Sequence, residues 1–161
     1  MSAPETTFIA EPGSHEVTTS AVIAAPLAAI YRAYVEQDLF VRWWGPKELT
    51  SKVDRWEPVT GGSWRVVHVD PDGNEYAFRG VFHEVVPGER LVLTFEFEGM
   101  PGHVCLETHS FETVDGGTKV TQHAVFQSVA DRDGMKDSGM EQHAPVAMGQ
   151  LQDVARSLQE G

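Results

Sequence analysis

The stretch from Ser63 to Glu98, SWRVVHVDPDGNEYAFRGVFHEVVPGERLVLTFEFE, decides the fold. It contains three runs in which hydrophobic residues recur at every second position, the period of a β-strand with one buried face. The first break, Asp70-Pro71-Asp72-Gly73-Asn74, suits a type I turn with Gly73 left-handed, which makes a three-residue hairpin loop. The second break, Pro87-Gly88, suits a type II turn. The stretch therefore predicts three consecutive antiparallel strands.

The same alternation continues on both sides of this stretch. The predicted strands are 15–23, 50–57, 63–69, 74–86, 91–98, 104–114 and 118–127. Pro26 opens a helix after the first strand, because proline is tolerated at the first helical position, and a second short helix at 39–44 ends before Gly45-Pro46. Helical spacing returns beyond Ala130. Pro145 lies within that last segment and either kinks the helix or marks the start of its long part.

These elements predict an α+β architecture, with seven strands in one curved antiparallel sheet. The two short helices and the long C-terminal helix are the elements available to cover one face of this sheet. A long helix laid across a curved sheet leaves a gap between the two, where a ligand would sit. Residues 1–13, with Pro4, Pro12 and Gly13, are expected to be a flexible N-terminal arm, and 14–161 a single domain.

Composition excludes several classes of partner. The 161 residues carry a formal charge of −12, from 24 acidic and 12 basic residues, and no Lys/Arg cluster interrupts this balance. Nucleic acids and anionic membranes both need a concentrated cationic face, so neither is an expected partner. The apolar stretches are too short for membrane insertion, and no signal peptide is visible. With a single cysteine and no cofactor motif, we expect a cytoplasmic protein without a cofactor.

The hairpin at Asp70–Asn74 places side chains on faces of the sheet. If Asp70 pairs with Asn74, then His68 faces Tyr76 and Val66 faces Phe78, and opposed residues share one face. Each aromatic residue at strand spacing has an ordinary alternative role in core packing. As a set, aromatics with polar tips and flexible methionines favour a ligand site. The candidate ligand-binding residues are Trp64, His68, Tyr76, Phe78, Phe95, Phe97, Met140, His143 and Met148.

The last predicted hairpin holds the residues of a candidate metal site. If Asp115-Gly116-Gly117 is a three-residue loop, His109 lies opposite His123, and Glu107 is the nearest further ligand. Zinc needs a third or fourth ligand, and a one-residue change of register would separate the two histidines. We expect both histidines to face solvent on the outer side of the sheet, with no metal bound.

Other chemistry has little support in the sequence. No Gly-x-Ser-x-Gly elbow is present, and Cys105 at strand spacing is expected to be a small buried group. Gly61-Gly62 precedes a strand, so no helix N-terminus follows that could receive a phosphate. General acid–base chemistry in an apolar pocket would fall to His68, Tyr76, His103 or His143.

Several segments together resemble the heat-shock ATPase-activator-homologue family of the SRPBCC (START-like) superfamily. They are Phe40-Val41-Arg42-Trp43-Trp44-Gly45-Pro46, Gly61-Gly62-Ser63-Trp64-Arg65, Pro71-Asp72-Gly73, Glu89-Arg90-Leu91-Val92, Asp115-Gly116-Gly117-Thr118-Lys119-Val120-Thr121 and Gly139-Met140-Glu141. The resemblance runs from about Val17 to Leu158. It implies the helix-grip fold of the birch-pollen allergen, in which a seven-stranded sheet grips a C-terminal helix around a cavity.

The resemblance implies no single catalytic motif, so three functions stay open. The first is binding of a small hydrophobic or aromatic molecule in the cavity. The second is an enzyme of the cyclase, dehydratase or isomerase type that uses the same cavity. The third is an interaction module that stimulates a chaperone ATPase. An apolar outer sheet face would favour this function, but Thr94, Glu96 and Glu98 predict that the outer face is polar. A homodimer is the commonest soluble assembly and is left open.

Overall fold

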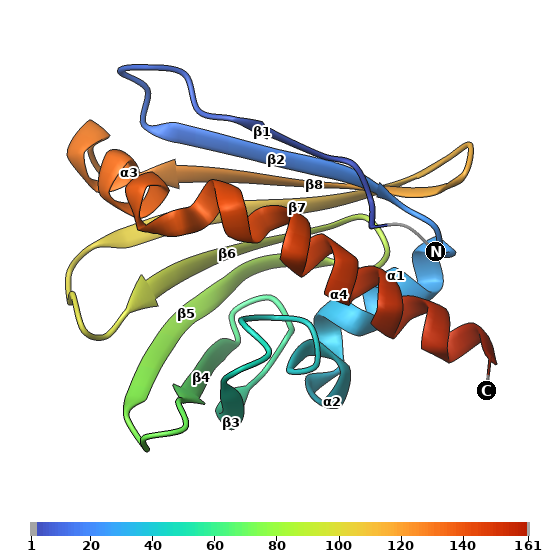
Figure 1. Cartoon of the computed structure of the whole chain (residues 1–161), viewed down its shortest axis with the longest axis horizontal. Coiled ribbons are helices and arrows are strands. Elements are labelled where there is room, and N and C mark those ends of the chain that lie inside the picture. The colour runs from blue at the N-terminus through green and yellow to red at the C-terminus, as the bar shows by residue number, and fades with distance from the viewer. Residues whose placement is uncertain (1–2, 161) are drawn as a thin grey trace.

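The computed structural model describes residues 3–160, which form a curved antiparallel sheet with helices on one face (Figure 1). The strands in this part of the chain are β1 Thr6–Ile9, β2 Glu16–Ile23, β3 Thr50–Trp56, β4 Ser63–Val69, β5 Glu75–Val86, β6 Arg90–Phe97, β7 Val104–Val114 and β8 Gly117–Phe126. Their order across the sheet is β1-β2-β8-β7-β6-β5-β4-β3. The strands from β3 to β8 therefore form the predicted meander, and β2 closes against β8.

The sheet has eight strands in the described residues, one more than the seven expected. The additional strand, β1, pairs antiparallel with β2 and brings Phe8 opposite Thr19. Phe8 packs against a small cluster that includes Val17 and Phe126. Part of the expected flexible arm is thus an edge strand, because its β-branched and aromatic residues favour strand pairing. The arm's first two residues lie outside the described part of the chain.

The two key hairpins differ in how well the sequence predicts them. The β4–β5 turn has the expected form, with Gly73 at φ +88° and its N–H donating to Asp70 O at 3.0 Å. In the β7–β8 turn, Val114 pairs with Gly117, so the loop holds two residues where three were expected. Gly116, at φ +90°, supplies the left-handed conformation that the shorter loop needs. This difference shifts the β7–β8 register by one residue.

The helices that follow β2 are α1 Leu27–Val35 and α2 Gln37–Phe40. The second was expected at 39–44 and instead ends at Phe40, so the two tryptophans lie in the turn that follows. Trp43 Nε1 donates to the carbonyl of Ala33 at 2.8 Å, which ties this turn to α1. That interaction holds the Trp43-Trp44 turn against α1.

The C-terminal segment is divided into α3 Val129–Met135, a π-helical turn Lys136–Met140 and α4 Glu141–Glu160. Gly139 has φ +104° and interrupts the helix, so the bend lies there and Pro145 is accommodated near the start of α4. No helix in the described residues is long and apolar enough to cross a membrane.

The main core lies between the inner face of the sheet, α1 and α4, and Figure 1 shows α4 laid across that face. Ile30 from α1, Leu91 from β6 and Leu151 from α4 are almost fully buried there. Arg132 of α3 is buried as well, and its guanidinium donates to the carbonyls of Glu16 at 3.0 Å and Glu11 at 2.9 Å. Arg132 therefore fastens α3 to the β1–β2 hairpin.

Candidate functional site

A second group of side chains, here called the aromatic cluster, lies on the inner face of β3–β6. Its members are Phe40, Trp44, Val53, Trp56, Trp64, Val66, Phe78, Phe82, Val85, Leu93 and Phe95. None of these described residues comes from α4. The ring of Trp44 lies at the centre, with centroid distances of 5.8 Å to Trp64, 5.4 Å to Phe78 and 6.3 Å to Phe95. The space expected beside Trp64 is therefore occupied by Trp44.

Three phenylalanines of β5 and β6, near the loop that joins β6 to β7, are less buried than the tryptophan Trp64 of the aromatic cluster. Phe78 stacks on Phe95 at 5.4 Å and contacts Phe97 at 5.2 Å, as the predicted strand faces require. All three phenylalanines are only partly buried, whereas Trp64 is 3% exposed. An apolar surface of three rings thus remains accessible on the inner face of the sheet.

The register of β4 and β5 is the predicted one, and His68 faces Tyr76. Tyr76 nevertheless takes no part in the site, because it is 38% exposed and its hydroxyl donates to Asp70 Oδ2 at 3.2 Å. It follows the hairpin turn directly, so the turn carboxylate holds the phenol in water. The expected binding role of Tyr76 is not supported by this geometry.

His68 is buried, with its ring 4.9 Å from that of Trp44. Its Nδ1 lies 3.0 Å from Ser51 Oγ, and burial lowers the pKa of the imidazole below its ordinary value. The backbone of Gly45 packs on the ring: a Cβ at that position would lie 2.7 Å from His68 Nε2. His68 is thus a neutral part of the packing between β4 and the Trp43–Pro46 segment.

The three expected residues of the C-terminal segment are not brought together with the aromatics. Met148 lies in the main core, and Met140 packs against the cluster of Val17 and Cys105. His143 faces a different site altogether, the groove described next. The nine expected residues therefore do not form one pocket, because α4 packs on α1, β1 and β2 while the aromatics lie on β4–β6.

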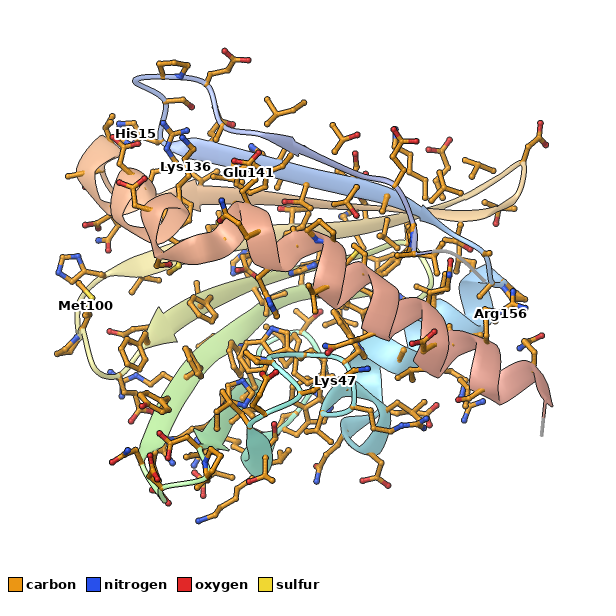
Figure 2. All side chains as sticks on the ribbon, in the orientation of Figure 1. His15, Lys47, Met100, Lys136, Glu141 and Arg156 are labelled. Carbon is orange, nitrogen blue, oxygen red and sulfur yellow. The ribbon has the colours of Figure 1, made fainter. Side chains whose placement is uncertain are left out.

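A groove of about 480 Å³ runs between α4 and the loop after α2. It is lined by Ala3, Pro46, Lys47, Glu48, His143, Pro145, Val146, Gly149, Gln150 and Asp153. Figure 2 labels Lys47 on this loop, below α4. At its floor Gln150 donates from Nε2 to the carbonyls of Trp43 at 2.7 Å and Gly45 at 3.0 Å, and its Oε1 is buried without a partner among the described residues. Gln150 thus ties α4 to the Trp43–Pro46 segment, whose Trp44 belongs to the aromatic cluster.

A third set of side chains, here called the inner polar cluster, consists of Tyr34, Glu107 and His109. Glu107 and His109 face inward on β7, opposite Leu93 and Leu91 of β6. Glu107 Oε1 lies 2.9 Å from His109 Nε2, and the two side chains are 14% and 13% exposed. The ring of Tyr34 from α1 is 5.6 Å from that of His109. A carboxylate, an imidazole and a phenol therefore lie near one another on the inner face, with Gln122 of β8 opposite His109.

The charge of Glu107 acts on its neighbours. Burial, assisted by that charge, raises the pKa of the Tyr34 hydroxyl above its ordinary value. Burial and the same carboxylate raise the pKa of the Cys105 thiol, whose Sγ lies 3.9 Å from Glu107 Oε2. Cys105 is 3% exposed, as expected for a small buried group, and is not poised as a nucleophile.

The expectation that both histidines of this hairpin face outward is wrong for His109. The two-residue β7–β8 turn pairs His109 with Gln122 and Thr108 with His123, so the two histidines lie on opposite faces. His123 contacts Glu16 on the outer face. Within residues 3–160 no three His, Cys, Asp or Glu side chains are arranged so that they could hold a metal ion. The sequence suggests Glu107 only as a metal ligand, but its even spacing from His109 predicts that the two share a face.

The remaining acid–base candidate, His103, is half exposed and contacts Asp131 at 2.9 Å. It is thus engaged with α3 near the surface. His68, Tyr76, His103 and His143 each have separate surroundings, and the structure brings no two of them together as an acid–base pair.

The curved sheet with two short helices on its inner face and a long C-terminal helix defines a helix-grip protein of the START-like class. The sequence of residues 24–156 matches the family described as Activator of Hsp90 ATPase homolog 1-like protein. The chain belongs to this family, as the resemblance of its motifs predicted.

Solved structures show the same fold. A crystal structure of a Rhodobacter sphaeroides protein is 22% identical with a TM-score of 0.86, covering 95% of this chain and 99% of that one. A Mycobacterium smegmatis protein is 22% identical with a TM-score of 0.84, covering 96% and 99%. An AHSA1-like protein from Aeromonas hydrophila is 18% identical with a TM-score of 0.70, covering 91% and 95%. No curated protein matches this chain.

Proposed function

We propose that this protein binds a small hydrophobic or aromatic molecule between the inner face of the sheet and α4. The observation that carries the proposal is the partly exposed surface of Phe78, Phe95 and Phe97 on a face that α4 packs against elsewhere. Aromatic surface left open inside a fold costs free energy in water, and a bound apolar molecule would cover it. The inner polar cluster would supply the few polar contacts that fix a ligand's orientation.

A thermal-shift screen tests this proposal. The panel contains fatty acids, flavonoids, aromatic polyketides and sterols. A ligand at a hundred times its Kd stabilises the fold by about 2.7 kcal/mol, which for a domain of this size raises Tm by roughly 5–10 °C. The Phe95→Leu variant should lose most of the shift, because it removes a ring from the open surface.

The matched control is Phe111→Leu, the same substitution at an inner-face position buried in the main core beneath α1. It should lower Tm without ligand but keep the shift. A panel that gives no shift with the wild-type protein would refute the proposal, and so would equal shifts in both variants.

A second candidate is docking on a chaperone ATPase, the activity named in the family's description. The outer sheet face is less polar than expected, since Val81 and Leu106 are 47% and 43% exposed, although Glu96 and Glu98 form ion pairs there. A Val81→Glu/Leu106→Glu variant should then abolish stimulation of a chaperone's ATP hydrolysis. Absence of stimulation by the wild-type protein would exclude this candidate.

A further inference from the structure

Glu107 is an acid on the inner face of the sheet whose ion-pair partner among the described residues is a histidine. Within residues 3–160 no lysine or arginine forms an ion pair with it, and its one ion-pair partner is His109. Every other ion pair described in the sheet joins residues that lie on its outer face or at its edges, such as Arg65 with Glu98 and Arg79 with Glu96. A carboxylate surrounded by apolar groups is costly unless hydrogen bonds or a cation compensate it.

The two oxygens of the Glu107 carboxylate differ in their hydrogen-bond partners. His109 Nδ1 is buried without a partner among the described residues, and its Nε2 lies 2.9 Å from Glu107 Oε1. Glu107 Oε2 has only the thiol of Cys105, a weak donor, at 3.9 Å. One oxygen of the carboxylate therefore retains unused acceptor capacity.

Solvent reaches this position even though it faces inward, because the Glu107 side chain is 14% exposed. Leu93 and Ala124 lie directly opposite Glu107, and two aromatic rings are close by: Phe95 is its diagonal neighbour on β6, and the ring of Tyr34 lies 5.6 Å from that of His109. Tyr34 is itself buried, and its hydroxyl has no hydrogen-bond partner in the described part of the chain. A second polar atom is thus free to contact a ligand.

On the basis of the proposed function, we infer that the ligand is an aromatic molecule carrying a protonated amine, which Glu107 binds through its free oxygen. An ammonium group would neutralise the carboxylate and donate the missing hydrogen bond. Aromatic faces attract cations through their quadrupole, so the rings near Glu107 act in the same direction. The formal charge of −12 favours approach of a cation over an anion.

The test uses three naphthalene probes that differ only in the polar group: 2-naphthylmethylamine, 2-naphthalenemethanol and 2-naphthoate. Their Kd values are measured near neutral pH by isothermal titration calorimetry. The amine should bind at least about tenfold more tightly than the alcohol, as expected for a hydrogen bond to a charged group, and the naphthoate most weakly. Glu107→Gln should weaken binding of the amine much more than binding of the alcohol, so that the amine-to-alcohol ratio falls to nearly one.

The control variant is Glu112→Gln, which makes the same change of charge on an exposed position of β7. It should keep the full preference for the amine, so a general effect of net charge is separated from recognition by Glu107. Equal binding of amine and alcohol by the wild-type protein would overturn the inference, as would an unchanged ratio in a folded Glu107→Gln variant, while the proposed function would stand. Failure of all three probes to bind would also overturn the inference, and the thermal-shift panel would then decide the proposed function.

Discussion

The inner polar cluster should lower the stability of the fold, and removing it should raise the free energy of unfolding. The perturbation is the double substitution Glu107→Leu/His109→Leu. It removes the buried His109 Nδ1 that lacks a partner, an atom whose desolvation costs about 1–3 kcal/mol. Exchanging an interior ion pair for apolar residues of similar volume is neutral or stabilising by up to about 4 kcal/mol. Since the two side chains are 14% and 13% exposed, we expect the lower half of that range, about 1–2 kcal/mol.

Urea unfolding at neutral pH measures this change, with the m-value showing whether the two states stay comparable. The corresponding rise in Tm is roughly 2–8 °C for a domain of this size. Glu107→Leu alone should be less stable than the wild-type protein, because it leaves both nitrogens of His109 unpaired, and the second substitution should recover the loss. A control pair on the outer face of the same strand, Ser110→Leu/Glu112→Leu, should change stability by less than about 0.5 kcal/mol.

The reasoning is refuted if the free energy of unfolding of the double variant falls by more than about 1 kcal/mol at an unchanged m-value. The Glu107–His109 pair would then stabilise the fold. If the double variant is more stable and no longer prefers the naphthalene amine over the alcohol, the inner polar cluster lowers stability but serves binding, as expected for a binding site.

Three further predictions concern the frame around the site. Thr118→Val should lower the free energy of unfolding, measured in urea, by about 1–2 kcal/mol, because the fully buried hydroxyl donates to the carbonyl of Ala25 at 2.8 Å. An equal loss of stability in the outer-face control Thr121→Val would contradict this reason. Burial lowers the folded-state pKa of His68, so the unfolded chain takes up the proton first as the pH falls. Stability should be complete above the unfolded pKa of about 6.5 and decline below it. His68→Asn should lose less stability than the wild-type protein between about pH 7.5 and pH 5, and parallel losses would exclude His68 as the cause. Arg132→Met should lower Tm by several degrees, since two backbone carbonyls lose a charged donor. Amide hydrogen exchange should then speed up more in the β1–β2 hairpin than in the rest of the sheet. An equal increase of exchange in all strands would show that Arg132 does not fasten α3 to the hairpin.

The strands of the meander could be predicted from the sequence because each has a buried face and ends at a residue with a strong turn preference. The Asp70–Asn74 loop is the best case, since proline, aspartate and glycine stand where the turn type requires them, and the register of β4 and β5 follows. The Gly116-Gly117 pair was ambiguous. Either glycine can take a positive φ, so a two-residue and a three-residue turn were both compatible with the sequence.

That one ambiguity decided the candidate site. With the longer loop, His109 and His123 would share a face, whereas the shorter loop separates them and leaves His109 with Glu107 inside. The place of Trp44 could not be predicted either, because it depends on long-range contacts of an irregular turn with the inner face of β4. Side-chain periodicity gives the face of a residue but not which distant segment covers it.

The position of Ala3 bears on how binding should be assayed. Ala3 lines the groove and packs close to Gly149 in the middle of α4. A bulky group attached shortly before Ala3 would be close to this groove and would compete with any molecule that uses it. At the other end of the described chain, α4 continues to Glu160, beyond Asp153 of the groove, so that end is the better point of attachment for surface immobilisation or a fluorescent fusion.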